Sequence, residues 1–420
     1  MKSIARWLFQ TLARLVLRRY RPVVIGVAGS IGKTATKEAI AAALDSPDRP
    51  VRQTRGSFNA EIGVPVTILS GGPAQKRWWQ WLRVFVGGVS LLLRRQPYPA
   101  VLILELGTDK PGDLGPLLRL AKPRIGVLTA IAPEHLEFFG DLAGVAAEEA
   151  GIITTLPAEG TAVVNIDDEQ ARAVAKPGRV RTISYGWTPE AQIRAEHLDL
   201  TTDDRGQLSG MVVKVRLAGE VVPIGIPGVI GRHQAYPILA AVAVAEALGE
   251  SAALTIERLK RYQPPPGRMR LLAGLSGSLI IDDSYNASPA AMAAALVTLF
   301  ELKTHGRKLA VLGQMSELGS SAAYWHDWVG EKIGHDRLHE LITIGPLADR
   351  IGRSAVAHGF SASRTVNVPT AEAAAARLQS DLHPGDVVLL KGSRYAAHLE
   401  RAAAILLAHP DRDQGRLVSS

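Results

Sequence analysis

VVIGVAGSIGKT, at residues 23–34, is the stretch that decides the fold. A short β-branched run leads into closely spaced glycines and then Lys33-Thr34, and residues 35–44 are good helix formers. Strand, glycine-rich loop and helix in this order are typical of a phosphate-binding loop. The strict pattern needs a glycine where this chain has Val27, so a glycine-rich turn with a chance Lys-Thr pair is the alternative.

In such a loop the glycines let backbone N–H groups turn toward phosphate oxygens. Lys33 can reach the terminal phosphates, and the Thr34 hydroxyl can hold Mg²⁺. We therefore expect ATP and Mg²⁺ as cofactors. The predicted nucleotide-binding residues of the loop are Gly29, Ser30, Ile31, Gly32, Lys33 and Thr34.

The whole chain has 420 residues, which predicts two or three domains with ample core. It contains no cysteine, which excludes disulfides, zinc–thiolate sites and thiol nucleophiles. We find neither a secretory signal nor a run of about 20 apolar residues, so we expect a cytoplasmic protein.

Positive charge is concentrated near the N-terminus. Residues 1–95 contain 16 Lys and Arg but 4 Asp and Glu, whereas the whole chain has a net charge of only +8. Residues 2–20 form a basic amphipathic pattern in which Ile4, Leu8, Leu12 and Leu15 recur at helical spacing. Such a helix can lie in a membrane interface at the inner face of the membrane, or it can dock on its own domain. We expect no nucleic-acid partner.

Residues 76–95 form an insertion that is rich in Trp and Arg. KRWWQWLR at 76–83 holds three of the seven tryptophans, and a mainly apolar run at 84–93 and Arg94-Arg95 follow. The run is too short to span a bilayer, but Trp flanked by Arg suits a membrane interface. The alternative is a buried helix with a basic rim.

Three apolar strands end at charged or polar residues. They are predicted at 101–104 before Glu105, at 125–131 before Ala132-Pro133-Glu134-His135, and at 162–166 before Asp167-Asp168. In α/β sheets, ligands bind at such carboxyl ends. Residues 180–226 alternate without a helix signal and predict a small antiparallel β patch, and 234–248 predict an alanine-rich helix.

A proline-rich stretch at 264–266 predicts a domain boundary. Beyond it, strands at 279–281, 309–312, 341–344 and 387–390 alternate with helices, which predicts a second, Rossmann-like parallel sheet. The fold class is therefore α/β. The predicted units are an N-terminal helix at 1–21, a central ATP-binding domain at 22–266 and a C-terminal domain at 267–420.

Eight motifs stand in one order along the chain. They are GSIGKT at 29–34, FNAEIGVP at 58–65, LELG at 104–107, PEHL at 133–136, GR at 267–268, DDSYNASP at 282–289, VLGQMSELG at 311–319 and KGSR at 391–394. With these motifs the chain resembles the Mur ligases over roughly residues 22–410, most closely the member that adds D-alanyl-D-alanine.

The resemblance implies an ATP-dependent carboxylate–amine ligase. A substrate carboxylate attacks the γ-phosphate, and an amine then displaces phosphate from the acyl phosphate. The expected role is addition of an amino acid or a dipeptide such as D-Ala-D-Ala to a small-molecule or lipid-linked cell-wall peptide precursor. The expected oligomeric state is a monomer.

The resemblance also implies roles for single residues. Thr34 and Glu105 look like ligands of a first Mg²⁺, and His135 looks like a ligand of a second metal. The implied nucleotide contacts from the inter-domain side are Arg268 at phosphate, Asp283 at the ribose and Asn286 at the adenine. Lys391 and Arg394 would close the cleft near the incoming amine, and Asn59 lies in the substrate loop. The implied catalytic set is Lys33, His135, Glu149 and Lys391.

Four features depart from the family pattern. The N-terminal domain that holds the UDP-sugar is expected to be missing, because about 22 residues precede the phosphate-loop strand. Gln234 and Ala60 stand where the family has Asn. Glu149 aligns with a carbamylated lysine, so we expect its carboxylate to serve as a metal ligand without modification. Glu148 is the candidate if the alignment slips by one residue.

Two rival functions remain open at this point. One is a ligase of the folylpolyglutamate or polyglutamate type, against which the DDSYNA and GQMSELG motifs argue. The other is a non-catalytic P-loop protein that binds a partner at the membrane. The retention of Lys33, Thr34, Glu105 and His135 argues against such degeneracy.

Overall fold

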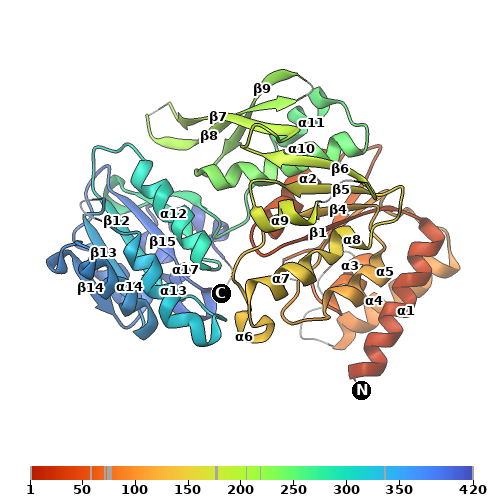
Figure 1. The fold of residues 1–420 in the computed structure, drawn as a ribbon, viewed down its shortest axis with the longest axis horizontal. Coiled ribbons are helices and arrows are strands. Elements are labelled where there is room, and N and C mark those ends of the chain that lie inside the picture. Colours follow the sequence, from red (N-terminus) through yellow and green to blue (C-terminus); the bar gives the residue numbers. More distant parts are fainter. Residues whose placement is uncertain are drawn as a thin grey trace.

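The computed structural model describes residues 2–56, 59–70, 72, 78–175, 178–204, 206–217, 219–334 and 337–418. Two sheets organise the chain, one in each half (Figure 1). The predicted Phe58, Lys76 and Arg77 lie outside the described residues, as do the side chains of residues 2–4.

The first sheet has nine strands in the order β2-β3-β1-β4-β5-β6-β7-β8-β9. Its strands are β1 (Val23–Ala28), β2 (Val51–Gln53), β3 (Val101–Glu105), β4 (Ile125–Leu128), β5 (Thr161–Asn165), β6 (Arg181–Gly186), β7 (Ile193–Thr202), β8 (Leu208–Leu217) and β9 (Glu220–Pro227). Neighbours from β2 to β7 pair in parallel, and β7, β8 and β9 pair antiparallel. The predicted β patch is thus present, but it begins at β7, because β6 continues the parallel sheet beside β5.

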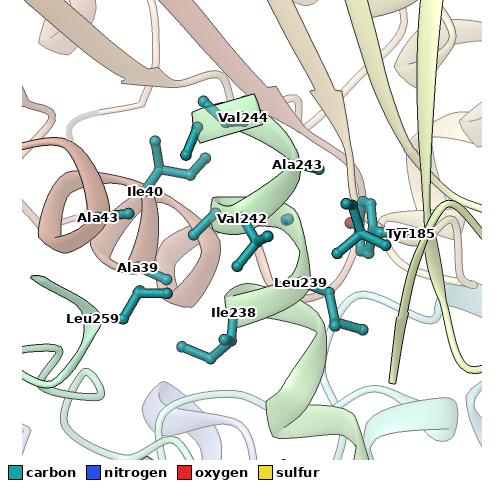
Figure 2. Close-up of a cluster of buried hydrophobic side chains, with 14 of the residues drawn as sticks. Ala39, Ile40, Ala43, Tyr185, Ile238, Leu239, Val242, Ala243, Val244 and Leu259 are labelled. Atoms are coloured by element: carbon teal, nitrogen blue, oxygen red, sulfur yellow. The ribbon is translucent and has the colours of Figure 1, made fainter. Parts of the chain in front are cut away.

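Helices cover both faces of this sheet. They are α1 (Lys2–Tyr20), α2 (Lys33–Leu44), α3 (Gly63–Ser70), α4 (Trp78–Leu93), α5 (Leu114–Ala121), α6 (Leu136–Phe139), α7 (Leu142–Glu149), α8 (Gly151–Thr154), α9 (Glu169–Val174), η1 (Arg232–Ala235), α10 (Tyr236–Ala247) and α11 (Ala252–Leu259). The core on one face packs α2 against α10, with Ile40 and Leu239 fully buried (Figure 2). This packing fixes the helix that follows the phosphate loop.

The other face carries the two segments for which the sequence left membrane contact open. α1 buries Phe9, Leu12, Ala13 and Val16, and α4 buries Val84, Gly88 and Leu91. Both helices therefore dock on their own domain. Leu8 and Leu15 of the predicted α1 stripe are exposed, Leu12 is buried, and Phe9 packs edge-on against Trp81. Within the part of the chain that the structure describes, no helix has the length and apolar character to cross a membrane.

The second sheet has six strands in the order β10-β11-β15-β12-β13-β14, all parallel except β10. The strands are β10 (Arg270–Ala273), β11 (Leu279–Asp283), β12 (Lys308–Gly313), β13 (Glu340–Ile344), β14 (Thr365–Val368) and β15 (Val387–Lys391). The helices are η2 (Leu275–Gly277), α12 (Pro289–Glu301), η3 (Gly319–Ser321), α13 (Ala322–Glu331), α14 (Pro346–Ala357), η4 (Ala362–Arg364), α15 (Ala371–Gln379), α16 (Arg394–Ala397), α17 (Leu399–Leu406), α18 (Pro410–Asp413) and η5 (Gln414–Arg416). The carboxyl ends of β11 and β15 bring Asp283 and Lys391 together, as the next section describes.

Candidate active site

The phosphate loop joins β1 to α2 at the carboxyl edge of the first sheet. Gly29 and Gly32 adopt φ values of 120° and 87°, which favour glycine. A Cβ at Gly29 would lie 2.3 Å from Thr129 Oγ1, so no larger residue fits there. Val27 lies in β1 and pairs in register with Glu105 of β3. The loop therefore begins after Val27, which explains why the strict glycine pattern is not needed at that position.

Lys33 lies at the start of α2 and folds back over the loop. Its Nζ donates to the carbonyl of Gly29 (2.5 Å) and forms an ion pair with Glu134 (3.2 Å). Burial opposes the charge of Lys33, but the carboxylates of Glu134, Glu149 and Glu105 outweigh it and raise the lysine pKa. Lys33 is thus a cation at the phosphate loop. Glu134 forms an ion pair with it, and Glu149 and Glu105 add negative charge nearby.

Thr34, Glu105 and Asn59 meet beside the loop. Glu105 Oε1 accepts hydrogen bonds from Thr34 Oγ1 (3.1 Å) and Asn59 Nδ2 (3.3 Å). Glu105 is only 3% exposed, and its Oε2 is buried without a hydrogen bond, 3.6 Å from Lys37 Nζ. A hydroxyl and a carboxylate with a spare buried oxygen are the hard ligands that Mg²⁺ prefers. The residues present fit one magnesium ion here.

Glu149 and its neighbour Glu148 face in different directions. The buried Glu149 carboxylate accepts from Gly29 N (2.7 Å) and from Thr108 Oγ1 (3.2 Å). Burial raises its pKa, which Lys33 counteracts. Glu148 instead accepts from the N–H groups of Gly112 (2.9 Å) and Leu114 (2.7 Å) before and at the start of α5. Of the two acids, Glu149 is therefore the one directed at the phosphate loop.

His135, at φ 52°, contacts the second half of the chain. Its Nδ1 lies 2.8 Å from Glu317 Oε2, and its Nε2 lies 4.0 Å from Asp109. Burial works against the protonated ring, yet Glu317 and Glu134 raise the histidine pKa. The described residues contain no cluster of three or more His, Asp or Glu side chains that could hold a metal ion. A second metal between His135 and Glu149 therefore stays a prediction.

The second sheet contributes the other predicted residues. Lys391 Nζ lies 2.5 Å from Asp283 Oδ2 and 3.2 Å from the carbonyl of Asn286. Burial lowers the pKa of Lys391, and Asp283 opposes that shift. Arg268 stacks over the Tyr285 ring at 4.4 Å. Lys391 is thus a buried partner of Asp283.

One cleft of about 150 Å³ collects most of the predicted residues. Its lining comprises Ser30, Ile31, Gly32, Lys33, Thr34, Asn59, Glu105, Glu134 and His135 from the first half, and Arg268, Tyr285, Asn286, Ala287, Ser288 and Ala291 from the second. Asp283, Lys391 and Arg394 are not in this lining, and Arg394 lies 5.5 Å from the ring of Tyr395. Gln234 is buried in η1, just before α10. The two halves of the chain together form the cleft.

Sequence reasoning assigned no role to three residues that touch this site. Glu134 pairs with Lys33, Glu317 contacts His135, and Lys37 approaches Glu105. Lys37 follows Lys33 by one helical turn, and that spacing is a signal that could have found it. Contacts across the two halves, such as Glu317 to His135, leave no such local signal.

Comparisons with known proteins agree with this geometry. Residues 88–245 match the Mur ligase middle domain, and residues 267–394 match the Mur ligase, glutamate ligase domain. A UDP-N-acetylmuramoyl-tripeptide–D-alanyl-D-alanine ligase of Mycobacterium tuberculosis (strain CDC 1551 / Oshkosh) is 33% identical, over 92% of this chain and 73% of that protein. The protein of the same name from Bacillus subtilis is 29% identical, over 96% and 79%.

A solved structure shows the same fold. The MurF ligase of Thermotoga maritima, in complex with ADP, aligns with a TM-score of 0.77 and 27% identity. The alignment covers 94% of this chain and 82% of that one. With both domain matches in order and a relative above 30% identity, this chain belongs to the Mur ligase family.

Proposed function

We propose that this protein is an ATP-dependent ligase that adds D-alanyl-D-alanine to the peptide of a peptidoglycan precursor. The names of its relatives give the substrates, and the ADP complex of the Thermotoga protein supports use of ATP. The observation that carries the proposal is the cleft itself. Lys33 and Thr34 of the phosphate loop face Arg268 and Asn286 of the second half across it.

The chemistry requires two anions, a carboxylate and the γ-phosphate, to approach each other. Lys33 supplies a fixed positive charge where they meet, and its pKa, raised by three carboxylates, keeps it protonated. Thr34 and Glu105 would hold Mg²⁺, which neutralises phosphate charge when it is bound. Arg268 lines the opposite wall of the cleft and would neutralise nucleotide charge from there. The amine then attacks the carbonyl carbon of the acyl phosphate, so that a C–N bond forms, the C–O bond to the phosphorus-bearing oxygen breaks, and inorganic phosphate leaves while the amine nitrogen loses a proton.

The acceptor side of the site is a second cavity that shares Asn59 with the nucleotide cleft. It has a volume of about 730 Å³, and its lining includes Arg6 of α1, Asn59, Glu61, Asp109 and Lys110. Asn59 thus stands between the metal-binding carboxylate of Glu105 and this cavity. We assign the cavity to the precursor peptide, whose carboxylate would enter beside Asn59.

We propose that the enzyme acts as a monomer in the cytoplasm, at the inner face of the membrane. The basic residues of α1, together with Arg83 of α4 and Arg94-Arg95 after it, support membrane contact, and the precursor can then be UDP-linked or lipid-linked.

The test is release of ADP by the full chain with ATP and Mg²⁺. Muramoyl tripeptide precursors, UDP-linked and lipid-linked, are combined with D-Ala-D-Ala or with single amino acids, glutamate included. The proposal expects ADP only when both a precursor and D-Ala-D-Ala are present. Equal release with glutamate would favour the polyglutamate type of ligase, and release independent of both substrates would contradict ligation.

A further inference from the structure

The helices α1 and α4 pack against each other near one edge of the molecule (Figure 1). Phe9 stacks edge-on against Trp81 with ring centroids 5.7 Å apart, and a Cβ on Gly88 would meet Leu12. Further along, the Tyr20 hydroxyl donates to the carbonyl of Leu91 at 3.0 Å. Since contacts advance together along both helices, their N-terminal ends lie side by side.

Both helices of this pair expose large apolar side chains. The exposed side chains are Trp7, Leu8 and Leu15 of α1 and Trp78, Trp79, Leu82, Val86 and Leu93 of α4. Trp78 and Leu93 are 76% and 77% exposed. On α4, residues 78, 82, 86 and 93 fall within one stripe, because four-residue steps return to nearly the same side of a helix. We call these eight residues the helix-pair surface.

The charged residues of α1 and α4 are all basic. Neither α1 nor α4 contains an acidic residue. The exposed basic residues are Arg14, Arg18, Arg19, Arg83, Arg94 and Arg95. Tryptophan and leucine bordered by arginine are the composition of helices that lie in a lipid interface, where the apolar side chains enter and the cations meet anionic headgroups.

We infer that the helix-pair surface docks this protein on an anionic lipid bilayer. The charge argues for lipid over a second copy of the chain, because two such surfaces would oppose arginine to arginine. Arg6, which precedes Trp7, lines the acceptor cavity and forms an ion pair with Glu61. Docking would therefore place that cavity beside the headgroups. The use of this placement, to receive a lipid-linked precursor, rests on the proposed function, whereas docking itself does not.

Vesicle flotation of the full chain tests the inference. Vesicles of phosphatidylcholine alone are compared with vesicles that also contain phosphatidylglycerol, at low and high salt. We expect flotation with phosphatidylglycerol that weakens in high salt. The variant Trp78→Ser/Trp79→Ser/Leu82→Ser should bind roughly tenfold more weakly or worse. The matched control, Val221→Ser/Leu254→Ser/Val297→Ser, removes exposed apolar side chains elsewhere and should bind like the wild type.

Wild-type protein that stays unbound, or a control that loses binding equally, overturns the inference. A wild-type dimer that the first triple variant makes monomeric, without vesicle binding, would assign the helix-pair surface to self-association instead. ADP release with a water-soluble precursor is measured for each variant. Vesicle binding without any ligation would retain the docking and remove the ligase proposal, so the two failures are distinguishable.

Discussion

The Glu149 carboxylate accepts a 2.7 Å hydrogen bond from the backbone N–H of Gly29, which lies 120 residues earlier in the chain. Gly29 is the first glycine of the phosphate loop. Its φ of 120° favours glycine, and the neighbouring Thr129 leaves no room for a Cβ. Glu149 thus fixes the loop backbone and adds negative charge near Lys33. We regard Glu149 as a positioning residue. Its side chain already ends in a carboxylate, so it needs no carbamylation by CO₂ of the kind expected at the aligned lysine.

Replacement of Glu149 should therefore abolish most ligation. Glu149→Ala removes the acceptor for Gly29, and Glu149→Gln keeps an acceptor but removes the charge near Lys33. We expect kcat to fall by at least about tenfold in both variants, and wild-type activity to be insensitive to bicarbonate. The matched control is Glu148→Gln, since Glu148 bonds only Gly112 and Leu114 near α5. Full activity in Glu149→Ala would refute this role.

Lys37 should set the magnesium requirement. Its Nζ is fully buried between the Thr54 carbonyl (2.6 Å) and Glu105 Oε2 (3.6 Å). Lys37→Met would leave the Glu105 carboxylate without this cation, so its orientation toward Thr34 would be less well fixed. We expect the Mg²⁺ concentration for half-maximal ADP release to rise by about tenfold or more. Lys37→Arg should recover part of the loss, and an unchanged Mg²⁺ titration in Lys37→Met would contradict the assignment.

The sequence predicted the sheets, the phosphate loop and the cleft residues because these depend on local patterns. Alternating strands and helices with charged residues at strand ends suffice to place Lys33, Thr34 and Glu105 at one edge. The buried side of α1 was not predictable in the same way. Leu8 and Phe9 are both apolar, and the packing partners Trp81 and Phe85 of α4 select Phe9 for the core.

The positions of two predicted site residues depend on distant partners. His135 lines the cleft, and its ring contacts Glu317 across the two halves of the chain. Lys391 lies outside that lining, where its Nζ pairs with the Asp283 carboxylate. In each case an ion pair whose members are more than 100 residues apart decides where the side chain lies.

Asp282 should make stability depend on pH. Burial raises its pKa from 3.8 to about 6, and its Oδ2 is buried without a hydrogen bond. An acid whose pKa is higher in the folded chain contributes stability below its unfolded pKa, and this is lost as pH rises through the folded pKa. We expect this contribution to the free energy of unfolding to fall by about 2–3 kcal/mol between pH 4 and 7.

Asp282→Asn removes that titration while keeping an oxygen that can accept from Ser284 N–H. Denaturant unfolding of the wild type and the variant at both pH values measures the difference. The free energy of unfolding of the variant should exceed that of the wild type at the higher pH only. An equal difference at both pH values would show that Asp282 does not titrate in this range.

Ligation of D-Ala-D-Ala to a muramoyl tripeptide should depend on Lys33. The most direct measurement is mass spectrometry of the joined product, made by wild-type protein and by Lys33→Ala under identical conditions with ATP and Mg²⁺. We predict product of the summed mass less one water from the wild type, and a rate at least about 10³-fold lower from a folded Lys33→Ala. No product from the wild type with either form of the precursor, or near-normal product from Lys33→Ala, would contradict the account.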